Sequence, residues 1–188
     1  MLAGAVDRLA AEGIPVQSMQ LMGGAISIVE FQRDVLGLLA NAANPNGMLK
    51  RITAYDLADK QELDDVCPGP PLPAIYHKSL LYFVARALEP SPTEFEEPMV
   101  GLYKSATGPM PSGPQHLVDL IGGPGNLVQA PTADTAPPDS RSKALGHGDF
   151  DNDEQTMTSV LLRILGKTAF DADVHPYPKG GMPSQPAR

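Results

Sequence analysis

The first half of the chain shows two different spacings of its apolar positions. Residues 2–12 carry apolar side chains at helical spacing, and Gly13 follows as a residue suited to end a helix. Short continuous apolar runs at 16–22 and 52–57 are typical of strands that are buried on both faces. The pattern therefore predicts one helix and then two strands, with further helices between and after them.

Three more helices follow from the same pattern. Residues 30–43, 76–89 and about 153–165 carry apolar side chains three or four positions apart. Asn152 and Gln155 have the spacing of a capping box, which favours a helix start at this point. The buried stripe expected on the second of these helices is Leu80, Leu81, Val84 and Leu88.

The second half of the chain is interrupted by proline and glycine. Residues 99–104 predict a third, short strand, and the acidic residues 59–65 predict a loop. Residues 105–146 contain 7 prolines and 6 glycines, so we expect a long loop there with at most one helical turn, at 117–121. Loops of this length are usually functional or disordered.

This order of elements predicts an α/β fold. Strands that alternate with helices join through right-handed crossovers into a parallel sheet with helices on both faces. We therefore expect a three-layer domain with a small, mainly parallel sheet over residues 1–170, followed by a flexible Pro/Gly-rich tail at 171–188. A sheet of three strands leaves open edges at which a partner strand can add.

Charge and composition exclude several classes of protein. The chain has 14 Lys and Arg against 22 Asp and Glu, a net charge of −8, and no long basic run, which argues against non-specific nucleic-acid binding. Its single cysteine excludes an internal disulfide framework and a thiolate zinc site. No apolar stretch reaches the ~18 residues of a membrane helix, and the first residues lack the pattern of a signal peptide. We therefore expect a cytoplasmic protein without a membrane span.

One acidic cluster invites comparison with a calcium loop. Asp149, Asp151 and Asp153 alternate like the first three ligands of an EF-hand, but the sixth and twelfth positions hold Glu154 and Val160 instead of Gly and Glu. Carboxylates at a helix start, where they complement the helix dipole, explain the cluster without a metal. We expect no metal site.

Two further motifs predict no cofactor or thiol chemistry. Gly23–Gly24 and residues 122–125 lack the glycine spacing of a dinucleotide or phosphate loop. Cys67 precedes His147 in the chain and lies in a proline-rich turn, whereas a caspase-like enzyme carries its cysteine after the histidine. We interpret Cys67 as a bystander thiol.

Two short sequence motifs, together with the order of elements, resemble those of a known superfamily. The motifs are YHKSLLY at residues 76–82 and HGDFDND at residues 147–153. With the strand and helix order they resemble the C-terminal half of the α/β-hydrolase fold, in a bacterial branch of that superfamily. The resemblance covers most of residues 1–166. In this superfamily the catalytic acid follows the second of the corresponding strands, and the catalytic histidine precedes the last helix.

The resemblance implies particular site residues. His147 corresponds to the general base of a catalytic triad, and Asp59 to the acid that orients it, with Asp56 and Asp64 as alternatives. The simpler interpretations are a solvated histidine at a helix start and an ordinary acidic surface loop, in which Glu62 also lies.

The departure from the superfamily is the missing nucleophile. The signature G-x-S-x-G, which places the serine on a sharp turn between strand and helix, does not occur in the sequence. We therefore expect part of a serine esterase or acyl-hydrolase, truncated or encoded separately, that acts on a small-molecule ester or acyl substrate only when an N-terminal half completes it. The alternative is a non-catalytic, degenerate α/β domain that associates with itself or another protein through its open sheet edge.

Overall fold

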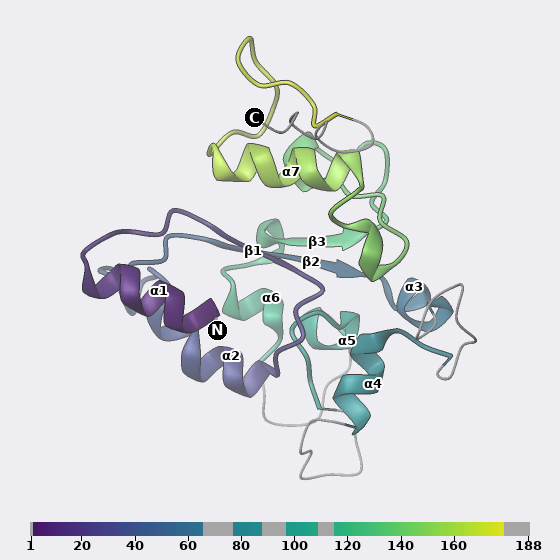
Figure 1. Cartoon of the computed structure of the whole chain (residues 1–188), viewed down its shortest axis with the longest axis horizontal. Helices are drawn as coiled ribbons and strands as arrows, with labels where there is room; N and C mark the ends of the chain where they lie inside the picture. Colours follow the sequence, from purple (N-terminus) through teal and green to yellow (C-terminus); the bar gives the residue numbers. More distant parts are fainter. Residues whose placement is uncertain (1, 66–76, 88–96, 109–114, 179–188) are drawn as a thin grey trace, which may run out of the picture.

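The structure, a computed structural model, has a parallel three-stranded sheet at its centre (Figure 1). Its strands, in spatial order, are β1 (Met19–Met22), β2 (Ile52–Leu57) and β3 (Leu127–Ala130). Both strand pairs are parallel, which confirms a small parallel sheet in an α/β fold. The structure describes residues 2–65, 77–87, 97–108 and 115–178.

Helices lie around this sheet on both faces. In the described ranges they are α1 (Leu2–Ala11), α2 (Ile28–Asp34), α3 (Asp59–Asp64), α4 (Leu80–Ala87), α5 (Tyr103–Ala106), α6 (Leu117–Leu120) and α7 (Glu154–Ile164). Short 3-10 turns occur at Leu36–Leu38, Pro124–Asn126, Pro138–Ser140 and His147–Asp149. None of the described helices combines the length and apolar character that a membrane crossing requires.

The core is divided by the sheet into two layers. Below the sheet in Figure 1, α1, α2 and α6 pack on one face, and α7 lies alone above the other. The lower layer contains the apolar residues Val6, Ile28, Phe31, Ile52, Ala54, Leu117 and Ile121. The upper layer contains Tyr55, Leu57, Val128, Ala130, Ala144, Phe150 and Val160. Successive residues of β2 therefore serve opposite layers, and all six are buried.

The predicted third strand is wrong. Residues 98–101 run antiparallel to the segment after β1, where the N–H of Val100 donates to the carbonyl of Ile26, and they do not join the sheet. Gly101 also packs against the backbone of Gly23 and Gly24 so closely that a Cβ would overlap with it. The third place in the sheet belongs to β3, which lies inside the predicted loop 105–146.

Two predicted helix boundaries change in the structure. α2 begins at Ile28 because the side chain of Ser27 accepts a hydrogen bond from the N–H of Glu30, and it ends at Asp34 instead of continuing to residue 43. The chain after it forms a 3-10 turn and then pairs with Leu49. α7 is capped by Asp153, whose carboxylate accepts from the N–H of Thr156, so the capping box predicted at Asn152 is wrong.

The buried stripe of α4 also differs from the prediction, and α7 buries polar side chains. On α4, Leu80 is exposed, and the buried face consists of Leu81, Tyr82 and Ala85. Leu88 and Cys67 lie outside the described residues. On α7, Ile164 is exposed, whereas the polar residues Thr156, Ser159 and Arg163 are buried. Both helices turn faces inward that hydrophobicity alone does not select.

Candidate functional site

The acidic segment after β2 is a helix and places one carboxylate in the interior. The N–H of Ala58 donates to the carbonyl of Ala130, which keeps β2 and β3 paired until α3 begins. Asp59 and Glu62 lie in the first turn of α3, where carboxylates are favourable for the helix dipole. The side chain of Glu62 is completely buried, and α3 corrects the prediction of a loop at 59–65.

His147 reaches this buried carboxylate from a distant part of the chain. Its Nε2 lies 3.0 Å from Oε1 and 3.1 Å from Oε2 of Glu62. The side chain of His147 remains 22% exposed, while that of Glu62 is 0% exposed. The pair therefore joins a carboxylate shielded from water to an imidazole that solvent and small molecules can reach.

The turn that carries His147 is fixed by its own acidic residue. The carboxylate of Asp149 accepts hydrogen bonds from the N–H groups of Leu145 and Gly146, both at 3.0 Å. The buried side chain of Phe150 meets the imidazole ring of His147 edge to face, with ring centroids 6.3 Å apart. These contacts hold the histidine at the entrance to α7.

Gly23, directly after β1, forms the floor beneath the imidazole. Its φ of +51° lies in the left-handed region that favours glycine. A Cβ at this position would overlap with Nδ1 of His147, so the two residues can approach each other only because position 23 has no side chain. His147 is therefore located at the carboxyl end of β1, beside the edge of the sheet.

The predicted acid Asp59 has a different partner. Its Oδ1 accepts a hydrogen bond of 2.8 Å from the hydroxyl of Tyr82 on α4. One helical turn later on α3, Glu62 accepts a hydrogen bond from the hydroxyl of Ser79, the residue before α4. The structure thus brings His147 to Glu62, and it uses Asp59 to join α3 to α4.

The alternative acids lie in contrasting surroundings. Asp64 is exposed and forms an ion pair of 2.6 Å with Lys60. Asp56 points from β2 into the interior, is 0% exposed, and neither of its carboxyl oxygens has a hydrogen-bond partner among the described residues. Burial, with a smaller contribution from the negative charge of Glu62, raises the pKa of Asp56 well above its ordinary value.

The remaining acidic residues near His147 have structural partners. Asp149 holds the turn and Asp153 caps α7, where Lys143 also donates its N–H to the same carboxylate. Among the described residues, no three His, Cys, Asp or Glu side chains come together in a way that could hold a metal ion.

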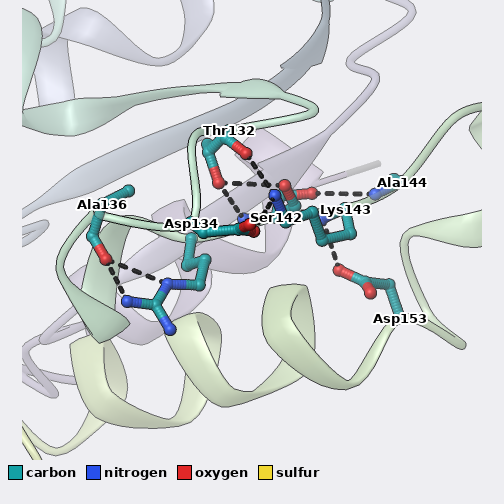
Figure 2. Close-up of polar contacts among 8 residues, drawn as sticks. Thr132, Asp134, Ala136, Ser142, Lys143, Ala144 and Asp153 are labelled. Carbon is teal, nitrogen blue, oxygen red and sulfur yellow. Dashed lines mark hydrogen bonds and ion pairs between the residues drawn. The ribbon is translucent and has the colours of Figure 1, made fainter.

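The segment between β3 and His147 is folded back on itself by polar contacts (Figure 2). The N–H of Thr132 donates to the carbonyl of Ser142, and the N–H of Ser142 donates to Oγ1 of Thr132. Nζ of Lys143 donates to the carbonyl of Thr132 and forms an ion pair of 2.6 Å with Asp134. Oγ of Ser142 and Oγ1 of Thr156 lie 2.7 Å apart, which attaches this segment to α7. The site histidine is thus connected to the sheet by an ordered path.

Chemically, the Glu62–His147 pair can accept and return a proton. A carboxylate fixes the orientation of an imidazole and stabilises its protonated form, and the imidazole exchanges the proton with a bound reactant. From the sequence alone, Glu62 is one of several carboxylates in a predicted acidic loop. The spacing of Asp59 and Glu62, three residues apart, was the available signal, because in a helix it puts both on one face.

Comparison with other proteins assigns no family or function to this chain. Comparison with protein-family models, with curated proteins and with solved structures finds no match.

Proposed function

We propose that this chain supplies the acid–histidine pair of an acyl-hydrolase site, with Glu62 as the acid and His147 as the general base. The observation that carries the proposal is the contact between the buried Glu62 carboxylate and the partly exposed His147 imidazole. Both groups lie where parallel strands end, the end at which α/β sheets collect their reactive loops. The substrate class is a small ester or other acyl compound.

In this proposal the two ring nitrogens of His147 have separate tasks. Nε2 is engaged by Glu62, which leaves Nδ1 as the nitrogen for proton transfer. Nδ1 lies against Gly23, beside the edge of the sheet.

The nucleophile itself comes from another polypeptide segment in this proposal. The sequence contains no G-x-S-x-G, and a triad without its nucleophile retains only weak catalysis from binding and positioning. The resemblance to the α/β-hydrolase fold supports the same division of roles. In that superfamily the acid follows the second of the corresponding strands and the histidine precedes the last helix; here Glu62 on α3 follows β2, and His147 precedes α7.

Two measurements on the purified chain test the proposal. A fluorophosphonate probe is expected to label no serine. Hydrolysis of p-nitrophenyl acetate is expected to be slow and to fall about tenfold in His147→Gln and in Glu62→Gln, because a positioned imidazole can still activate water. His175→Gln is the control, since His175 is exposed on the C-terminal segment. Equal rates in the parent chain and in His147→Gln contradict the proposal, as does a serine label that depends on His147.

A second candidate function, binding of a partner strand, is favoured by the backbone of β1. The N–H groups of Met19 and Gly23 donate to β2, so alternation turns the N–H of Gln20 away from the sheet. The side-chain amide of Gln20 is shielded from solvent, yet neither of its polar atoms has a partner among the described residues. An added strand is able to satisfy the outward backbone groups of this edge.

The edge candidate has a direct test in the oligomeric state. Light scattering is expected to show concentration-dependent association that is lost in Gln20→Pro, which removes the outward N–H and keeps the bonds to β2. Gln20→Ala keeps that N–H and is the matched control. A monomeric parent chain at every concentration contradicts self-association through β1.

A further inference from the structure

A second residue controls the proposed acid. Glu62 is completely buried, and two side chains engage its carboxylate: His147 through Nε2 and Ser79 through its hydroxyl. An ionised carboxylate taken out of water needs such donors, because each replaces part of the lost hydration. The orientation of the Glu62 carboxylate therefore depends on Ser79 as well as on His147.

The position of Ser79 is determined from three directions. Its N–H donates to the backbone carbonyl of Glu62 at 2.9 Å, and its side chain is completely buried. Its Oγ accepts a hydrogen bond of 3.4 Å from the N–H of Tyr82, which caps the start of α4. With this lone pair directed to α4, the hydroxyl proton is free to point at Oε2 of Glu62.

The neighbouring contact between α3 and α4 provides an internal comparison. Asp59 and Tyr82 join the same two helices one turn away, through a hydrogen bond that does not involve Glu62. The two pairs repeat the same three-residue spacing on both helices, so they contribute in similar ways to packing. Only the Ser79 pair reaches the carboxylate that contacts His147.

We propose that Ser79 is the positioning residue of the site: its hydroxyl holds the Glu62 carboxylate in the orientation in which it binds Nε2 of His147. This inference rests on the proposed role of the Glu62–His147 pair. Capping of α4 is the second task of the same hydroxyl. Without Ser79, the carboxylate rotates between partners and the imidazole loses its fixed orientation.

The experiment observes His147 directly in the full chain. The imidazole N–H proton gives a separate downfield NMR signal only while a hydrogen bond protects it from exchange with water. We expect this signal in the parent chain, in Ser79→Thr and in Tyr82→Phe, and its loss in Ser79→Ala. The rate at which diethyl pyrocarbonate modifies His147 is expected to rise at least about threefold in Ser79→Ala, as for the loss of a charge-assisted hydrogen bond.

A second substitution and the melting temperature serve as controls for loss of folding. Ser79→Gly also removes the hydroxyl, but glycine is an acceptable helix cap, so this variant keeps α4 if Ser79→Ala does not. Retention of the N–H signal in either folded variant overturns the inference, and so does an equal loss of the signal in Tyr82→Phe. Failure of the proposed function is distinguished by ester hydrolysis, which the positioning test does not use.

Discussion

The buried polar groups of two regions, the one around Arg163 and the one around Glu62, differ in how completely they are satisfied. Arg163 on α7 is 4% exposed and donates to four neutral oxygens: the carbonyls of Asp139 and Gly125 and the hydroxyls of Thr53 and Ser140. Glu62 has two side-chain partners, and beside it Asp56 is buried without any among the described residues.

The difference separates a structural cluster from a candidate site. The acceptors around Arg163 come from β2, the turn before β3 and the 3-10 turn at 138–140, so one side chain of α7 joins three other elements. The carboxyl groups of Glu62 and Asp56 have fewer hydrogen-bond partners than Arg163, and their burial lowers the stability of the fold. Buried ionisable groups with few hydrogen-bond partners are candidates for a function.

The largest expected effect concerns the saturated cluster. Arg163→Met keeps the apolar stem but removes four hydrogen bonds, and among the described residues only the carbonyl of Asp139 keeps another side-chain donor, the hydroxyl of Ser159, so we expect a loss of about 3–5 kcal/mol in the free energy of unfolding. Urea denaturation measures it. The downfield N–H signal of His147 is expected to survive in the folded fraction. A loss below about 1 kcal/mol contradicts the view that Arg163 joins the elements around α7.

A smaller but more local effect is expected at the floor of the site. Gly23→Ala combines a strained left-handed backbone with an overlap between its Cβ and Nδ1 of His147, so we expect a loss of about 2–3 kcal/mol and loss of the His147 N–H signal. Gly13→Ala is the matched control. Gly13 has a φ of +71° and no atom near its Cβ position, so only the backbone strain of about 1 kcal/mol remains. Equal losses in both variants show that His147 is not packed on Gly23.

The unsatisfied carboxyl group makes a prediction about pH. Because the pKa of Asp56 is raised in the folded state, the folded protein binds its proton more tightly than the unfolded chain does. Its contribution to stability is therefore complete below about pH 4, the range of an unfolded aspartate, and is lost as the pH rises toward the folded pKa. Asp56→Asn removes this dependence.

Chemical denaturation at pH 4 and pH 8 checks the sign. The stability of Asp56→Asn relative to the parent chain is expected to improve from the lower pH to the higher one. The same comparison for Asp64→Asn, at an exposed ion pair, is expected to change by less than about 0.5 kcal/mol. A parent chain that gains stability relative to Asp56→Asn with rising pH reverses the assignment.

The smallest effect is expected in the turn that carries His147. Asp149→Ala removes the acceptor of two backbone N–H groups in an exposed turn, for which we expect a loss of about 1 kcal/mol. The His147 N–H signal is expected to broaden without disappearing, since Glu62 and Gly23 still hold the ring. Thermal unfolding together with the NMR signal measures both parts, and an unchanged melting temperature contradicts a role for Asp149 in this turn.

Local sequence pattern is sufficient for elements whose own residues carry a clear apolar spacing. β2 has the bounds that its apolar run predicts, and α1 ends before a glycine in the left-handed conformation. β3 could not be found in this way, since its four residues carry no clear pattern and lie in a proline-rich region. Its place is determined by pairing with β2, an interaction between residues about 70 positions apart in the register of the sheet.

The candidate site was accessible to sequence reasoning only in part. The motif at 147–153 and its position before a helix identify His147 as a candidate. Nothing in the sequence singles out Glu62 in this way, because the segment 59–65 lacks an apolar stripe and is predicted to be a loop. The partner of a buried carboxylate depends on which helix face turns inward, and that is decided by the tertiary contacts of α3 with Ser79 and His147.

Among the described residues no further strand pairs with β1, and a site completed by an added strand at this edge would have a particular kinetic signature. The rate of assembly is then proportional to the product of two concentrations, that of this chain and that of the added strand. Diluting both components twofold therefore reduces the rate of assembly fourfold. A site contained in one chain loses only half its total rate on the same dilution. Covalent linkage of the missing strand replaces the free concentration by an effective one, of the order of millimolar for a short flexible linker. An assay on this chain therefore has to report stoichiometry and concentration before a low rate can be attributed to poor chemistry.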